Sequence, residues 1–329
     1  MTGLYAGVDG GKSKTVCLLA DGTGTIMGWG RAGGGDKAAV SLAVAMDAIT
    51  EAVDAALLQA TVGRDALEVG CFGLAGADWP EDFVLLHDEL RRRGLARDVM
   101  VRNDAQIALR GASTSGLGMV ISAGTHLSVA LRTAGGQEWF SGWSSVDGPG
   151  GAETGRRVMW AVLHAYDSRG APTALTDAVL EATALTPEGL LRAISSGRVD
   201  EQFTARLAPL LFRTYTQTAD VVAAGIIVEV GREMARWVTG LSARFGLAGD
   251  DADVFLAGGM FRDSGPLLRD ALAAAVYTGA PGARLRPAAH EPVVGALLEA
   301  FERAGVRSTP AVLGRLSATT PAAAFFDTV

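Results

Sequence analysis

The sequence is poor in lysine, cysteine and histidine. Only three of its 29 basic residues are lysines, at positions 12, 14 and 37, and acidic residues number 36. The net charge of −7, without a long basic run, disfavours nucleic acid and anionic membranes as partners. The four histidines show no metal-ligand spacing, so nothing in their placement predicts a zinc site.

The two cysteines, Cys17 and Cys71, lie in apolar, strand-like runs. We expect buried free thiols in a reducing compartment, not a disulfide or a cluster site. No apolar run reaches the roughly 18 residues that span a bilayer, and residues 1–5 lack the basic and apolar regions of a signal peptide. These absences predict a cytoplasmic protein without a membrane partner.

Glycine and hydrophobic residues are abundant. The 329 residues include 43 glycines, many of them in clusters, and 49% of the chain is hydrophobic. A chain of this length and composition can build a large core and is expected to form two domains.

The first glycine cluster lies in residues 7–28, which are typical of a strand, a glycine turn, a second strand, an Asp-Gly turn and a third strand. A Walker A loop is excluded because Ala6 stands where its first glycine belongs and because strand-like residues 15–20 follow instead of a helix. A Rossmann fingerprint fails for the same reason. The turn is either an ordinary hairpin or a phosphate site. Two of the three lysines, Lys12 and Lys14, lie in it, which favours phosphate.

Helical and strand-like segments alternate through the rest of the first third of the chain. We expect helices at 37–59, 81–93 and 103–111 and strands at 69–75 and 98–102. This alternation predicts an α/β domain over residues 1–112.

The strand–turn–strand pattern then returns at residues 118–131, which predicts a weak internal duplication. Helices are expected over much of 152–245, with a break near 183–187, and a strand at 254–257 precedes Gly258 and Gly259. Further helices are expected at 264–276 and 291–304. We therefore predict a second α/β domain with a helical insertion at 113–305 and a loose tail at 306–329.

Four carboxylates, at Asp9, Asp78, Asp104 and Asp147, follow strands or glycine turns. In α/β folds such positions line the ligand crevice at the carboxyl ends of strands. Asp104 opens a helix, so it is either a helix cap or a general base for phosphoryl transfer. Both hold if Asn103 supplies the cap.

Seven segments, in this order, resemble the BadF/BadG/BcrA/BcrD-type ATPase and N-acetylglucosamine kinase family of the actin–hexokinase–Hsp70 superfold. They are GVDGGKSKT, GLAGAD, VRNDAQIALRGA, ISAGTHLSVAL, VDGPGGAETGRR, FLAGGMF and EPVVGALLEA, within residues 4–304. The resemblance implies two RNase H-like domains flanking a nucleotide cleft. It also implies a homodimer.

By this resemblance the protein is an ATP-dependent kinase for N-acetylglucosamine or a related hexosamine. Asp104 matches the general base, and Asp9 matches the residue that handles Mg²⁺. The positions expected at ATP are Gly10, Gly11, Lys12, Ser13, Lys14, Thr15, Gly124, Thr125, Gly258 and Gly259. Those expected at the sugar are Asp36, Asp78, Asn103, Asp104, Thr125 and Asp147. The alternatives are an ATPase that drives a partner protein and a non-catalytic sugar or nucleotide sensor.

The chain departs from the family pattern at several positions. Lys12 and His126 stand where the family usually has glycine, and Gly148 follows Asp147 where an acid is usual. Asp36 stands where asparagine is common, and its carboxylate is expected to favour a free amino sugar through a charge-assisted hydrogen bond. The family's reductase activators hold an iron–sulfur cluster with cysteines, so the two strand-like cysteines disfavour that version of the ATPase.

Overall fold

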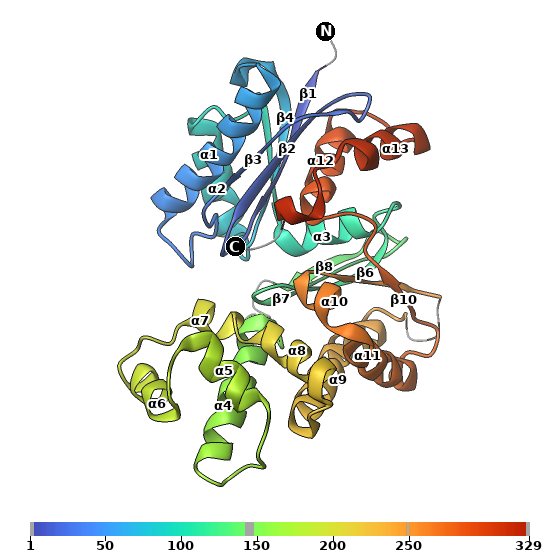
Figure 1. Ribbon diagram of the computed structural model, residues 1–329. Coiled ribbons are helices and arrows are strands. Elements are labelled where there is room, and N and C mark those ends of the chain that lie inside the picture. Colours follow the sequence, from blue (N-terminus) through green and yellow to red (C-terminus); the bar gives the residue numbers. More distant parts are fainter. Residues whose placement is uncertain (1–2, 142–147, 248, 250, 327–329) are drawn as a thin grey trace. The chain divides into compact units, whose positions relative to one another are not determined.

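The computed structural model describes residues 3–141, 148–247, 249 and 251–326 of the chain. It shows a mixed α/β architecture with two five-stranded sheets among these residues (Figure 1), which confirms the predicted fold class. The chain divides into two compact units. The first comprises Met1–Val120, Val129–Trp143 and Pro287–Val329, and the second comprises Ile121–Ser128 and Ser144–Arg286.

The first sheet has the strand order β3-β2-β1-β4-β5. Its strands are β1 (Leu4–Gly10), β2 (Thr15–Asp21), β3 (Ile26–Ala32), β4 (Leu67–Leu74) and β5 (Asp98–Asn103). The three strands nearest the N-terminus pair antiparallel through their short turns, whereas β4 and β5 continue the sheet in parallel. The carboxyl ends of β1, β4 and β5 therefore meet at one edge.

Helices cover both faces of this sheet (Figure 1). On one face lie α1 (Leu42–Ala60) and α2 (Pro80–Arg92), and on the other lie α12 (Pro292–Arg303) and α13 (Pro310–Thr319). Side chains of β2 alternate between the two cores: Cys17 packs on the α1 side, whereas Val16 and Leu18 pack on the α12 side. Because helices bury both faces of the sheet, β2 is apolar over residues 16–20 and does not alternate with polar residues.

Helix α12 packs so closely against β1 and α3 (Asp104–Ala112) that their backbones nearly touch. A Cβ placed on Gly7 of β1 would lie 2.4 Å from the Leu297 nitrogen of α12. On the other side, a Cβ on Gly295 would lie 1.9 Å from the Ile107 carbonyl oxygen of α3 and 2.5 Å from the Gly111 nitrogen. Only glycine allows these close contacts, so these positions determine where α12 and α3 lie.

The second sheet has the order β10-β9-β6-β7-β8. Its strands are β6 (Gly118–Ala123), β7 (Leu127–Arg132), β8 (Glu138–Ser141), β9 (Asp253–Ala257) and β10 (Arg284–Pro287). Counted outward from its central strand, this order repeats that of the first sheet, in agreement with the predicted duplication. The four-residue strands β8 and β10 were not expected, because segments this short carry little periodicity.

Helices make up most of the second unit. They are α4 (Gly151–Tyr166), α5 (Leu175–Thr183), α6 (Pro187–Ser195), α7 (Glu201–Ala205), α8 (Ala208–Thr218), α9 (Val221–Arg244), α10 (Gly259–Asp263) and α11 (Gly265–Gly279). The expected break near 183–187 separates α5 from α6, since Thr186 caps the new helix through its side-chain oxygen.

The expectation of a loose C-terminal tail is wrong for the residues described up to 326. Residues 310–319 form α13, and a 3₁₀ turn follows at Ala323–Phe326. Leu316 and Phe326 are buried in the core on the α12 side of the sheet. The many Ala, Ser and Thr residues in the tail obscured these apolar anchors.

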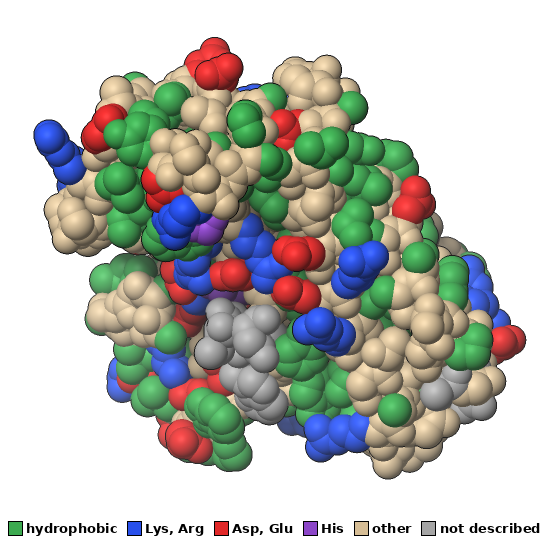
Figure 2. Space-filling view, turned by 90° about the horizontal axis from the view of Figure 1, so that it is seen from below, with side chains coloured by type: hydrophobic (Ala, Val, Ile, Leu, Met, Phe, Trp, Pro, Cys, Tyr) green, Lys and Arg blue, Asp and Glu red, His purple; other side chains and the backbone are tan. Residues whose placement is uncertain are grey.

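Both cysteines are buried and free, as predicted. They belong to different cores, Cys17 on the α1 side and Cys71 on the α12 side, and burial raises the pKa of each thiol. No helix in the described part of the chain is both long and apolar enough to span a bilayer. Acidic and basic side chains lie close together on the face shown in Figure 2.

We expect Gly295→Ala to destabilise the first unit. The new methyl group would meet backbone atoms of α3, which cannot rotate away, so α12 must shift at a cost of about 1–3 kcal/mol. The urea-unfolding midpoint measures this change.

Gly314→Ala is the matched control, because its Cβ would enter open space on α13. We expect it to leave stability unchanged or to raise it by about 0.4–1 kcal/mol. Equal midpoints for Gly295→Ala and wild type would contradict the close packing of α12.

Candidate functional site

Three loops of the first unit are joined by backbone hydrogen bonds at the carboxyl edge of its sheet. The glycine turn after β1 closes on itself, since the Gly11 nitrogen donates to the Lys14 oxygen at 2.9 Å. The Gly35 nitrogen donates to the Gly11 oxygen at 2.9 Å, and the Ala75 nitrogen donates to the Gly10 oxygen at 3.0 Å. The turn after β1, the loop after β3 and the loop after β4 therefore support one another.

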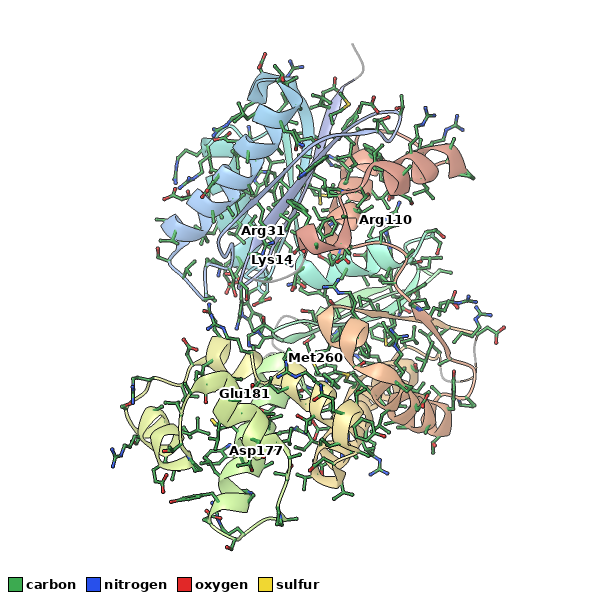
Figure 3. The ribbon with its side chains drawn as sticks, viewed as in Figure 1. Lys14, Arg31, Arg110, Asp177, Glu181 and Met260 are labelled. Atoms are coloured by element: carbon green, nitrogen blue, oxygen red, sulfur yellow. The ribbon has the colours of Figure 1, made fainter. Side chains whose placement is uncertain are left out.

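The predicted phosphate-contact residues of this turn differ in exposure. The side chains of Lys12, Ser13 and Lys14 are partly exposed, and Figure 3 shows Lys14 at the lower end of the strands. Thr15 is fully buried, and its hydroxyl oxygen lies 2.6 Å from the place of a Cβ on Gly35. In this structure the Thr15 hydroxyl is therefore not presented at the surface.

Asp9 lies near the end of β1, on the side of the sheet that carries α12. Burial, together with the negative charges of Asp104 and Glu291, raises the pKa of this carboxyl to about 7, while Lys14 opposes the rise. Glu291 is the residue before α12. It was not among the predicted site residues. Its Glu-Pro pair indicates a helix start, but nothing local indicates that this helix returns to β1.

Asn103 caps α3 and also holds the loop after β4. Its side-chain oxygen accepts from the Ala105 nitrogen at 3.0 Å, which confirms the predicted cap. Its side-chain nitrogen donates to the Ala77 oxygen and to the Asp78 carboxylate, both at 3.1 Å. With the cap supplied by Asn103, the partly exposed Asp104 stands at the first position of the helix. Its role as a base stays a prediction.

An ion pair connects the loop after β3 to the start of α2. The Lys37 ammonium lies 2.7 Å from the Asp82 carboxylate, which also accepts from the backbone nitrogens of Asp78 and Trp79. Asp36 is only 2% exposed and accepts from the Ala38 nitrogen at 2.8 Å. This network fixes the two loops that carry the predicted sugar contacts.

Asp36, Asp78, Asp82 and Asp104 form a region of the first unit that is rich in negative charge. Burial, together with the charges of Asp104, Asp36 and Asp82, raises the pKa of Asp78 to about 6, while Lys37 opposes the rise. The structure thus brings the predicted residues Asp9, Asp36, Asp78, Asn103 and Asp104 together in one unit. Another predicted sugar contact, Asp147, lies outside the described residues.

In the second unit two predicted nucleotide loops are neighbours. The turn after β6 rests on the start of α4, because the Gly151 nitrogen donates to the Gly124 oxygen at 2.8 Å and the Ala152 nitrogen to the Thr125 oxygen at 2.9 Å. A Cβ on Gly258 would lie 2.5 Å from the carbonyl oxygen of Ala123, at a φ of 92° that suits glycine.

His126, in the same turn, is held from the helical part of this unit. Its Nε2 atom lies 3.1 Å from the Glu201 carboxylate of α7. The His126 side chain, which stands where the family usually has glycine, therefore lies between the Gly124–Thr125 turn and α7.

The profile of the BadF/BadG/BcrA/BcrD ATPase family matches residues 6–300. The chain belongs to this family. The sequence resemblance is thereby confirmed over nearly the whole chain.

One curated relative matches about half of the chain. The N-acetylmuramic acid/N-acetylglucosamine kinase of Clostridium acetobutylicum is 31% identical over 168 residues, 50% of this chain and 55% of that protein. The chain thus matches about half the length of this curated relative.

Two solved structures share the fold over nearly their whole length. A candidate N-acetylglucosamine kinase from Chromobacterium violaceum is 23% identical at a TM-score of 0.71, covering 90% of this chain and 98% of that one. A ROK family glucokinase from Streptomyces griseus, solved with glucose and AMPPNP, is 19% identical at a TM-score of 0.62, covering 91% and 100%. At these sequence identities the similarity supports the fold of this chain and nothing further.

We expect the stability of Asp78→Asn, relative to wild type, to depend on pH. Because folding raises the pKa of Asp78 from 3.8 to about 6, the unfolded chain loses this proton first as the pH rises. The wild type is therefore penalised progressively between about pH 4 and pH 6 and fully above that window, whereas the asparagine variant is not. Urea-unfolding midpoints at pH 4 and pH 7 measure the difference.

The exposed carboxylate of Asp88 on α2 supplies the control, since Asp88→Asn removes a charge that is mostly in solvent. A gain for Asp78→Asn that is the same at both pH values would contradict the acidic environment assigned to Asp78.

Proposed function

We propose that the protein is an ATP-dependent kinase that phosphorylates a hydroxyl group of N-acetylglucosamine or a related hexosamine. The proposal rests on the position of Asp104. It lies at the start of α3, close enough to Asp9 and Asp78 for its charge to raise the pKa of both. The names of the Clostridium relative and of the two structural neighbours support the same class of reaction.

In this proposal Asp104 is the general base. A carboxylate in this place would orient the attacking hydroxyl and take its proton as the bond to phosphorus forms. The surrounding structure holds the carboxylate in place: one Asp104 oxygen accepts from the Ala105 nitrogen at 2.9 Å, and Asn103 fixes the first turn of the helix. The base therefore lies on a rigid element and not on a mobile loop.

Phosphate binding is proposed for the glycine turns of both units. In the first unit Lys12, Ser13 and Lys14 offer two ammonium groups and a hydroxyl beside a glycine turn. In the second unit Gly124, Thr125, Gly258 and Gly259 would present backbone groups to the nucleotide. Backbone N–H groups and lysines are the donors that commonly cradle phosphates.

The carboxylates of the first unit fit a magnesium ion. Asp9 carries an unfavourable burial and two nearby negative charges that a cation would relieve. The described residues contain no cluster of three metal-binding side chains, and Mg²⁺ typically uses one or two carboxylates together with water and substrate phosphates. We propose that Asp9 holds the ion. When bound, it would neutralise charge on the transferring phosphoryl group.

The sugar is proposed to lie against Asp78 and Asp104, whose carboxylate oxygens can accept hydrogen bonds from hydroxyl groups, with the buried Asp36 and Asn103 supporting them. Asp36, Asp82 and Asp104 lie close enough for their negative charges to raise the pKa of Asp78, so this region is rich in negative charge. A cationic amino sugar would lower the repulsion, whereas an acidic sugar would add to it. We therefore expect glucosamine and N-acetylglucosamine to be better substrates than N-acetylmuramic acid, which carries a carboxylate.

A sugar panel tests the activity. We expect ADP release from ATP to require a sugar and to be faster with the hexosamines than with glucose, measured in a coupled assay with Mg²⁺ present. Release without any sugar would indicate an ATPase that drives a partner, and no release would indicate a sensor. Equal rates with glucosamine and glucose would remove support for the role of Asp36.

Substitution of the base is the second test. We expect Asp104→Asn to lower kcat on the order of 10²-fold or more, because an amide cannot accept the proton. Asp98→Asn is the matched control, since Asp98 lies at the opposite end of β5 and pairs with Arg303 at the surface. A near wild-type kcat for Asp104→Asn would exclude it as the base, provided that both variants keep the wild-type unfolding midpoint.

A further inference from the structure

A hollow in the first unit contains three arginines that the proposed reaction does not use. It lies beside α3 and is lined by Arg102, Arg110, Arg132, Glu138, Trp139 and Glu299, among others. It is small, with a cavity volume of about 20 Å³, and one side is open to solvent. Figure 3 labels Arg110, near the end of α3 beside α12.

Arg102 is already neutralised. Its Nε and Nη2 atoms donate to one oxygen of Glu299 at 3.1 and 3.0 Å, and this carboxylate raises the pKa of Arg102 despite its burial. This pair forms a fixed wall of the hollow.

Arg110 is not neutralised in this way. It is only 8% exposed, and its Nη1 atom is buried without a hydrogen-bond partner among the described residues. The Glu302 carboxylate lies 3.8 Å from its Nε atom, and that side chain is 60% exposed. Burial and the charge of Arg132 lower the pKa of Arg110, although Glu299 and Glu302 oppose this. A buried guanidinium with an unused donor is costly unless an anion satisfies it.

Arg132 lies next to Arg110. A Cβ placed on Gly116 would be 3.7 Å from both the Arg110 Nε atom and the Arg132 Nη1 atom, so both side chains reach Gly116, and the charge of Arg132 acts on Arg110. The partner of Arg132 is Glu138, at 3.0 Å, and both side chains are about one-third exposed. This pair can open at little cost, because exposed ion pairs contribute little free energy.

We propose that this hollow binds a phosphate group held by Arg110 and Arg132. Two adjacent guanidinium groups match the double charge and the several oxygens of a phosphate, which they grip through paired N–H donors. Glu138 competes for Arg132, so binding requires that Arg132 turn from Glu138 to the phosphate. The phosphate comes either from the free ion or from a sugar phosphate, and the two sources share this chemistry.

The test is calorimetric titration of the full chain with inorganic phosphate and, separately, with glucose 6-phosphate. We expect Arg132→Gln to weaken binding about tenfold or more, the usual loss for a hydrogen bond between charged groups. Arg132 is preferred to the buried Arg110 because its side chain is partly exposed and its loss should not disturb folding. We expect Glu138→Gln to tighten binding, since it removes the competing carboxylate. The ligand with the lower Kd identifies the source.

Arg307→Gln is the control, because this exposed arginine follows α12 and does not line the hollow. It should bind phosphate as the wild type does. Phosphate that binds Arg132→Gln as tightly as wild type occupies another place, such as the glycine turn after β1, and would overturn the proposal. The proposal would also be overturned if neither ligand bound the wild type, or if Glu138→Gln bound phosphate more weakly than the wild type.

Discussion

The close packing of α12 against β1 and α3 is the constraint on which the first unit depends. Gly7, Gly111 and Gly295 let three backbones approach to distances that any side chain would prevent. This helix comes from near the end of the chain, yet it completes the core over strands from its beginning. It also places Glu291 close enough to Asp9 for its charge to raise the pKa of that carboxyl. The packing of α12 thus contributes to the stability of the unit and also places the negative charge of Glu291 near Asp9.

Asp9, Asp36, Asp78 and Asp104 lie close enough in the first unit for their charges to influence one another. Asp9 and Asp78 both keep a raised pKa, because burial and their acidic neighbours disfavour the charged forms. Lys14 and Lys37 offset only part of this repulsion. Such a region is suited to a cation and to ligands rich in hydrogen-bond donors, which is what the proposed kinase reaction requires. In the hollow beside α3, by contrast, acidic side chains are present, and it is the buried Nη1 atom of Arg110 that has no hydrogen-bond partner among the described residues.

Much of the fold could be predicted because its signals are local. The turn after β1, the strands up to β5 and the cap at Asn103 each follow from a few adjacent residues. The family's motif order also allowed the acidic residues to be proposed together. Other features had no local signal. Strands β8 and β10 are four residues long, and the tail packs through isolated residues such as Leu316 and Phe326 among Ala, Ser and Thr.

The sequence by itself determined the family, the α/β class and the identity of the acidic residues at the strand ends, because these depend on residue type and order along the chain. Tertiary structure alone decided which charges meet. Glu291 lies nearly three hundred residues from Asp9, Lys37 after β3 pairs with Asp82 of α2, and the side chains of Arg110 and Arg132 both reach Gly116. These contacts depend on how helices and strands pack, and the resulting burial and distance set the electrostatics that residue type leaves open.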